Sequence, residues 1–142
     1  MIDITNYDDD NIFAKILRQE IPSRKVFENK YVYAFEDINP QAPIHILVIP
    51  KKSFCSFEDF SKKADSKFIC EFIKSIDLIA EKLELKEGYR LITNIGKHGG
   101  QEVPHFHFHL LSGRPIGKMV STASSPNLLA IFTFPFPKSL AT

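Results

Sequence analysis

Three histidines occupy alternate positions in the run His105-Phe-His-Phe-His-Leu-Leu111. Because the side chains of a β-strand alternate between its two faces, a strand over residues 105–111 places His105, His107 and His109 on one face. The apolar residues between them then point the other way, towards a hydrophobic core. Residues two apart on a strand lie roughly 7 Å apart. At that spacing, three imidazoles can surround one small anionic group or one metal ion.

Two functional interpretations of this cluster are open. Zinc in catalytic sites commonly takes two or three imidazole ligands plus water. Alternatively, a neutral imidazole serves as a nucleophile while its neighbours position phosphate oxygens and move protons. The chain has five histidines and three lie in this run, so ordinary surface polarity explains the cluster poorly. Spacing alone does not choose between a metal site and a metal-free catalytic site.

Composition limits the class of protein. A chain of 142 residues with 44% hydrophobic and 25% charged residues predicts one ordinary globular domain. The formal net charge of +1 gives no electrostatic reason to expect nucleic acid or an anionic membrane as a partner. No apolar run is long enough to span a bilayer, and the acidic residues 1–10 do not resemble a signal peptide. Cys55 and Cys70 are expected to be free thiols, so we expect a cytoplasmic protein.

Hydrophobic periodicity and turn residues predict an α+β fold with an antiparallel sheet of about five strands. We expect one long helix at residues 65–85, with one or two short helices near 12–17 and 57–63. The expected strands are 25–27, 31–35, 44–49, 89–95 and 105–111, and a loop is expected at 96–101. Residues 1–120 are predicted to form the catalytic domain. The segment 121–142 is predicted to be a flexible or loosely docked tail, with partner docking as the alternative.

The histidine run and several other segments resemble the Hint branch of the histidine-triad (HIT) family, in its bacterial form. The likeness covers roughly residues 10–118 in register. Besides the run itself, it is carried by Asn94 and by five segments: Asn11–Pro22, Ala34–Pro43, His45–Lys51, Gly88–Leu91 and His98–Val103.

This resemblance implies a homodimer whose two sheets join into one, and an enzyme that hydrolyses purine nucleoside phosphoramidates, with an AMP or GMP moiety as the bound part. It implies a nucleotidyl-histidine intermediate and no required cofactor. His107 matches the nucleophile, His109 the histidine that contacts the phosphate, and His105 and His45 supporting histidines. The substrate-binding positions implied are Phe13, Ile16, Ile21, Phe35, Asp37, Ile38, Asn94, Gly100, Gln101 and Glu102.

The sequence departs from the wider family in ways that bear on the leaving group. Glu102 occupies a position where animal members carry a small hydroxyl residue, and a carboxylate there favours cationic amines such as lysyl or other aminoacyl phosphoramidates. Pro104 removes a backbone donor and indicates that this end of the histidine strand is unpaired. The chain has no Trp. Two alternatives stay open: a related enzyme acting on dinucleoside polyphosphates or transferring nucleotides, and a zinc- or nucleotide-binding module with little turnover.

Overall fold

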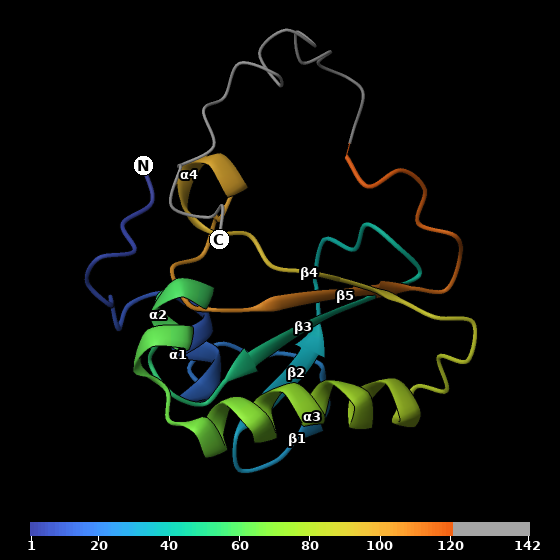
Figure 1. The fold of residues 1–142 in the computed structure, drawn as a ribbon, viewed down its shortest axis with the longest axis horizontal. Helices are drawn as coiled ribbons and strands as arrows, with labels where there is room; N and C mark the ends of the chain where they lie inside the picture. Colours follow the sequence, from blue (N-terminus) through green and yellow to red (C-terminus); the bar gives the residue numbers. More distant parts are fainter. Residues whose placement is uncertain (121–142) are drawn as a thin grey trace, which may run out of the picture.

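The computed structural model describes residues 1–120, and its centre is one five-stranded antiparallel sheet (Figure 1). The strands lie in the order β1-β2-β3-β5-β4, so β4 forms one edge and β5 lies between β3 and β4. Every neighbouring pair is antiparallel. Their bounds are Lys25–Glu28 (β1), Val32–Glu36 (β2), Ile44–Pro50 (β3), Arg90–Ile92 (β4) and Phe108–Ser112 (β5).

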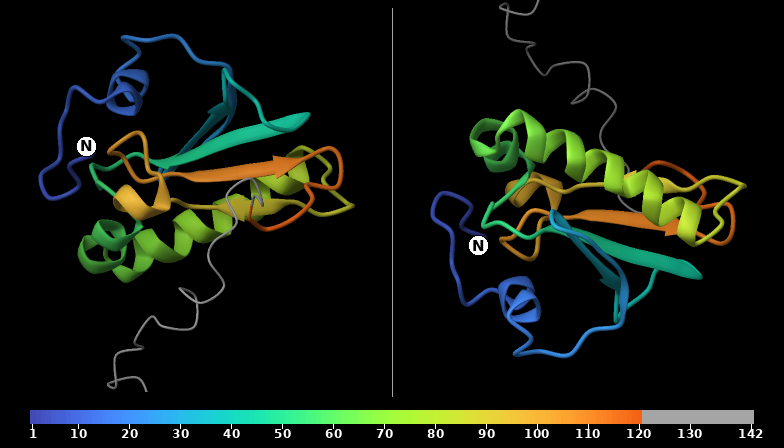
Figure 2. Two further views of the ribbon diagram at one scale, coloured as in Figure 1. Left: turned by 90° about the horizontal axis from the view of Figure 1, so that it is seen from above. Right: turned by 90° about the horizontal axis from the view of Figure 1, so that it is seen from below.

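Helices lie on both sides of this sheet. The long helix α3 (Ser66–Lys82) crosses one face, and the short helix α1 (Ile12–Leu17) lies on the other side (Figure 2). Two further short helices are α2 (Phe57–Lys63) and α4 (Gly96–Gly99). Helix α1 begins where the Asn11 side chain accepts hydrogen bonds from the backbone N–H groups of Phe13 and Ala14. This N-cap satisfies two otherwise unpaired donors and fixes the start of the helix.

Strand alternation divides the apolar residues into two cores. Val32 and Ala34 of β2, with Ile46 and Val48 of β3, face α3 and join the larger core. The intervening residues face the other way, and Phe35, Leu47 and Ile49 pack with Phe13 and Ile16 of α1. Because both faces of β2 and β3 are covered, these strands read in the sequence as nearly continuous apolar runs.

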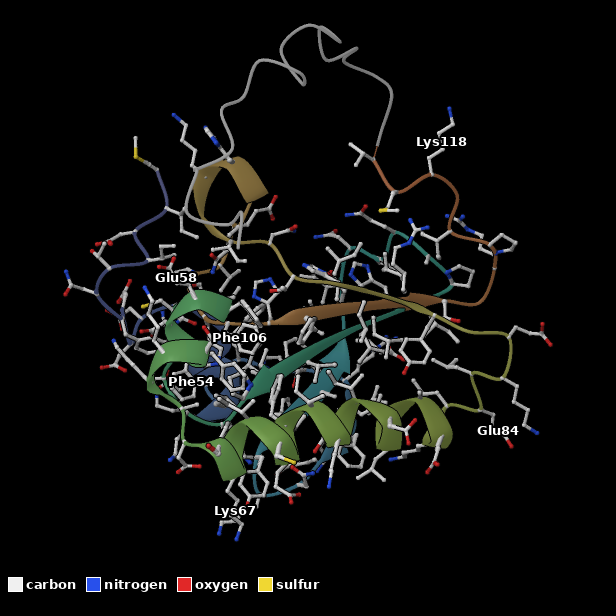
Figure 3. The ribbon with its side chains drawn as sticks, in the orientation of Figure 1. Phe54, Glu58, Lys67, Glu84, Phe106 and Lys118 are labelled. Carbon is white, nitrogen blue, oxygen red and sulfur yellow. The ribbon has the colours of Figure 1, made fainter. Side chains whose placement is uncertain are left out.

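The segment that leads into β5 is held by packing instead of by the sheet ladder. Phe106 is buried and stacks on Phe60 of α2 with ring centroids 4.6 Å apart. Its backbone N–H donates to the Phe54 carbonyl at 2.7 Å. Figure 3 shows Phe54 and Phe106 in the packed region beside α2, whereas charged side chains such as Lys67 point outward. The residues before β5 are therefore positioned by α2 and by the chain that precedes it.

The structure confirms the predicted α+β class and five-stranded sheet, with three differences. The predicted strand 89–95 is shorter in the structure, where β4 covers only Arg90–Ile92. The predicted strand 105–111 is wrong at its start, because β5 begins only at Phe108. Pro104 has no N–H to donate, and the Phe106 N–H is used by Phe54 instead of a strand partner, so the ladder cannot extend that far. The predicted loop at 96–101 contains α4, which adds a third short helix.

Three other expectations concern the chain as a whole. Cys55 and Cys70 are both free, as predicted. Among the described residues, no helix has the length and apolar character needed to cross a membrane. The predicted tail, residues 121–142, lies outside the described residues.

Candidate active site

A pocket of about 410 Å³ lies on the sheet face opposite α3, between α1, the end of β2 and the histidine segment. The size falls within the range of small-molecule sites. One wall is apolar, and the opposite side carries polar and titratable groups. The apolar wall includes Phe13, Ile16, Ile21, Phe35 and Ile38, and the polar groups include Asp37, Asn94, Glu102, His107 and His109.

His107 is the buried histidine that faces this pocket. Its Nδ1 lies 2.6 Å from the backbone carbonyl oxygen of His105. A carbonyl oxygen only accepts, so Nδ1 carries the proton and donates, which leaves the Nε2 lone pair free. The Phe13 ring packs edge-on against the imidazole, with centroids 5.0 Å apart. Burial lowers the pKa of His107, and the nearby carboxylates of Asp37 and Glu102 offset this only in part. The ring is therefore a neutral imidazole near pH 7, which is the nucleophilic form.

His105 lies behind the pocket and does not line it. Its residue exposure is 0%, and both ring nitrogens have partners. Nε2 donates to the Pro50 carbonyl oxygen at 3.0 Å, and Nδ1 accepts from the Tyr7 hydroxyl at 2.5 Å. Burial lowers the pKa of His105 to about 4, so this ring is also neutral. Its direct contribution to the site is the backbone carbonyl that holds His107.

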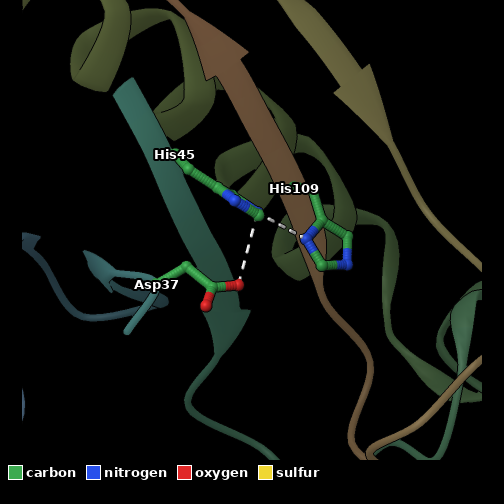
Figure 4. A group of neighbouring side chains, drawn as sticks. All are labelled: Asp37, His45 and His109. Carbon is green, nitrogen blue, oxygen red and sulfur yellow. Dashed lines mark hydrogen bonds and ion pairs between the residues drawn. The ribbon is translucent and has the colours of Figure 1, made fainter. Parts of the chain in front are cut away.

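A second group of side chains connects β3, β5 and the end of β2. His45 Nε2 lies 2.9 Å from His109 Nδ1 and 3.3 Å from Asp37 Oδ2. Dashed lines mark these two contacts in Figure 4. The backbone N–H of Gln41 donates to His45 Nδ1 at 3.1 Å. His45 Nδ1 is therefore an acceptor, and in neutral His45 the proton must be on Nε2.

The position of the proton on His45 determines the protonation of His109. His45 Nε2–H donates to His109 Nδ1, so the single proton of neutral His109 lies on Nε2, the nitrogen turned away from His45 in Figure 4. Burial lowers the pKa of His109 to about 4, helped by the neighbouring His107 and His45, and burial also lowers the pKa of His45. The pocket thus contains one imidazole with a free lone pair, on His107, and one with an available N–H, on His109.

The same group has the composition of a metal site, but its hydrogen bonds do not fit one. One ligand atom each from Asp37, His45 and His109 lie within 4.8 Å of one another, and this is the one such group within residues 1–120. Zinc would need the His45 Nε2 lone pair, which would move the ring proton to Nδ1. That proton would then point at the Gln41 N–H, and two donors cannot form a hydrogen bond with each other. The cluster is better explained as a hydrogen-bonded relay than as a set of metal ligands.

The structure brings most of the predicted site residues together. Nine of the ten predicted substrate-binding residues line the pocket with His107 and His109. Gln101 does not, because its buried side chain accepts from the Gly96 N–H and donates to the carbonyls of Cys55 and Val103. Its side chain stabilises the loop around α4, and the preceding residue, Gly100, lines the pocket. His105 and His45 lie one layer behind the pocket residues.

Sequence reasoning missed two contributors and several lining residues. Tyr7 comes from the N-terminal segment, 98 residues away from the histidine it contacts, and no local pattern indicates such a contact. Gln41 acts through its backbone N–H, which residue type does not reveal. Lining residues that the sequence interpretation omitted include Ile12, Ser23, Asn39, Leu47 and Val103. Of these, Leu47 could have been found, because it shares a strand face with His45.

This arrangement of one sheet, a long helix and a pocket served by paired histidines defines the histidine-triad class of hydrolases. Residues 18–116 match the HIT domain family model, and the chain belongs to this family. It is 46% identical over 114 residues to the purine nucleoside phosphoramidase of Escherichia coli K12, covering 80% of this chain and 95% of that protein. It is also 46% identical over 116 residues to a HIT-like protein of Azospirillum brasilense, covering 81% and 95%.

Solved structures agree with the sequence relatives. A HIT family hydrolase from Clostridium thermocellum superimposes with a TM-score of 0.73 at 37% identity, covering 80% of this chain and 99% of that chain. A histidine triad protein from Clostridium difficile gives 0.72 at 41% identity, covering 80% and 98%. The chain is accordingly an enzyme, a hydrolase of the histidine-triad type.

Proposed function

We propose that this enzyme hydrolyses the P–N bond of purine nucleoside 5′-phosphoramidates, including aminoacyl and lysyl phosphoramidates. The observation that carries the proposal is the orientation of His107, whose Nδ1–H is donated to the His105 carbonyl while the ring faces the pocket. The 46% identity to a relative named purine nucleoside phosphoramidase supports the same substrate class.

The chemistry proceeds in two displacements. His107 Nε2 attacks phosphorus, the P–N bond breaks, and the leaving amine takes its electron pair together with a proton from solvent. A nucleotidyl-histidine forms, and water then attacks the same phosphorus, returns a proton to solvent, and releases the nucleoside monophosphate and free His107. His109 Nε2–H donates a hydrogen bond to the phosphoryl oxygens as negative charge develops on them. The two smaller steps replace one difficult hydrolysis.

Nucleoside binding follows from the walls of the pocket. Phe13, Ile16 and Phe35 would form the apolar wall that contacts the purine, and the Asp37 carboxylate would accept hydrogen bonds from the ribose hydroxyls. An apolar slot reads the shape of a base more than its hydrogen-bonding groups. We therefore expect AMP and GMP to bind with similar dissociation constants, and isothermal titration of both nucleotides checks this. A large difference between them would contradict the proposed reading of the base.

The test of the function is hydrolysis of adenosine 5′-phosphoramidate by protein treated with EDTA. We expect AMP release without added metal, because the hydrogen bonds of Asp37, His45 and His109 do not suit zinc binding by this group. AMP release that appears only after zinc is added would reject metal independence. Faster turnover of a diadenosine polyphosphate would favour the related polyphosphate hydrolase or nucleotidyltransferase, and binding without turnover would favour a nucleotide-binding module.

The position of Glu102 leads to a prediction about which leaving amines the enzyme prefers. Its exposed side chain lies at the pocket that His107 faces, so its carboxylate can attract a cationic amine. An exposed ion pair contributes up to about 1 kcal/mol. Glu102→Ser should therefore lower the ratio of kcat/KM for a lysyl over a neutral amine phosphoramidate by up to about fivefold. Glu102→Gln, which keeps the size and removes the charge, is the matched control and should behave like Glu102→Ser. An unchanged ratio in both variants would contradict a role of the Glu102 charge in selecting the leaving amine.

The quaternary state and location are also part of the proposal. Strand β4 is an edge of the sheet, and Tyr89, Leu91 and Ile95 on or beside it are exposed apolar residues. Pairing of two β4 edges in a homodimer would cover exposed backbone groups and these side chains. Sedimentation equilibrium should then give twice the chain mass of 16.2 kDa, and a monomer would refute the dimer. Two free cysteines support a reducing compartment, the cytoplasm.

A further inference from the structure

The N-terminal segment supplies a contact to the histidine cluster that the proposed chemistry does not use. Tyr7 lies before α1 and is half-buried. Its hydroxyl is 2.5 Å from His105 Nδ1, and the two rings meet edge-on with centroids 5.6 Å apart. Neither Tyr7 nor His105 lines the substrate pocket. The contact is therefore a partly buried polar interaction that lies behind the proposed nucleophile.

The direction of this hydrogen bond is determined by the other partner of His105. The Pro50 carbonyl can only accept, so the proton of neutral His105 lies on Nε2 and is donated to Pro50. His105 Nδ1 is then an acceptor, and the Tyr7 O–H must be the donor. Burial raises the pKa of the Tyr7 hydroxyl, which keeps this donor protonated. Tyr7 and Pro50 together hold the ring from both sides.

The position of the His105 ring matters because the backbone carbonyl of the same residue orients His107. The His105 carbonyl accepts the His107 Nδ1–H at 2.6 Å, and His105 lies before the start of β5. Sheet hydrogen bonds therefore do not fix the backbone at this residue. Its position depends on the hydrogen bond from the Phe106 N–H to the Phe54 carbonyl, on the packing of Phe106 and on the two ring contacts of His105.

We propose that Tyr7 is a positioning residue for the nucleophile: it anchors the His105 ring, and through it the carbonyl that orients His107. The N-terminal segment is thereby part of the catalytic apparatus without touching substrate. The expected effect on kcat rests on the proposed function. The anchoring of His105 by Tyr7 does not depend on which substrate the enzyme uses. The phosphoryl group must meet His107 in near-attack geometry, and small misplacements there are costly.

The test is Tyr7→Phe, which keeps the ring and removes only the hydroxyl. We expect kcat to fall about 10-fold, with KM within about twofold, because the pocket walls are unchanged while the nucleophile is less well placed. Tyr31→Phe is the matched control. Tyr31 packs edge-on against Phe68 in the α3 core, on the other side of the sheet, so kcat should stay at the wild-type value.

A second readout does not depend on turnover. In protein with ¹⁵N-labelled histidine and no substrate, Tyr7→Phe should shift the His105 Nδ1 resonance, which loses its donor, and the His107 Nδ1–H resonance. The same resonances should not move in Tyr31→Phe. Unchanged resonances in Tyr7→Phe would overturn the proposal, and so would a wild-type kcat in that variant. If the wild-type enzyme proved inactive on phosphoramidates, the proposed function would fail, and the resonances alone would still decide whether Tyr7 anchors the histidines.

Discussion

Replacing His107 with alanine should lower kcat for adenosine 5′-phosphoramidate by at least about 10⁴-fold, which corresponds to about 5.5 kcal/mol of transition-state stabilisation. The variant loses the atom that attacks phosphorus, and the neighbouring imidazoles are fixed by their own hydrogen bonds. His109 uses Nδ1 to accept from His45, and both nitrogens of His105 are occupied. No neighbouring ring can substitute as the nucleophile. Quench-flow or steady-state assay of AMP release measures the loss.

Binding should survive the same substitution. Phe13 loses its edge-on contact with the His107 ring but keeps its packing against Phe35, and Asp37 stays beside His45, so the dissociation constant of AMP should change by only a few-fold. His98→Ala is the control, since this exposed histidine lies on α4 outside the pocket lining. Intact-mass analysis of quenched reactions should detect a nucleotidyl adduct on the wild-type protein and none on His107→Ala. Substantial turnover by His107→Ala would overturn the nucleophilic assignment.

The parts of the fold that were predicted from sequence are those that local patterns specify. The apolar run before Pro50 became β3, and the stretch Phe57–Lys63 became α2 with the predicted bounds. The long helix was predicted as 65–85 and observed as Ser66–Lys82, with the Asp65 side chain capping its start. In each case the periodicity of one segment predicts the type and approximate position of the element, so a single sequence contains enough information for that much. The end of the long helix, at Lys82, was predicted three residues too late.

The histidine run shows where such reasoning stops. Alternation correctly places Phe106 and Leu110 in the α3 core. It wrongly extends one strand through His105, because the position of that residue depends on Phe54, Pro50 and Tyr7, all distant in sequence. Residue type indicated that the histidines act together. Only the three-dimensional contacts distinguish a ring that faces the pocket from a ring that supports it from behind.

The hydrogen-bonded histidines also make the folded state sensitive to acid. Burial lowers the pKa of His105 from 6.5 to about 4. Between those values the unfolded chain binds a proton that the folded protein does not, so the free energy of unfolding falls as pH falls. For a fully buried group, a shift of this size corresponds to about 3 kcal/mol lost between pH 7 and pH 4. The pKa values of His45, His107 and His109 are lowered in the same direction and add to the loss.

Urea unfolding at a series of pH values from 7 to 4 measures this effect, with His105→Gln as the comparison. The variant lacks one titrating ring, so its free energy of unfolding should depend less steeply on pH than that of the wild type. The difference between the two proteins should approach about 1.4 kcal/mol per pH unit in the middle of the range. Carboxylates whose pKa is lowered, such as Asp59, contribute equally to both proteins and cancel in this difference. Equal slopes would mean that His105 is protonated as readily in the folded protein as in the unfolded chain, which is incompatible with a neutral ring held between Tyr7 and Pro50.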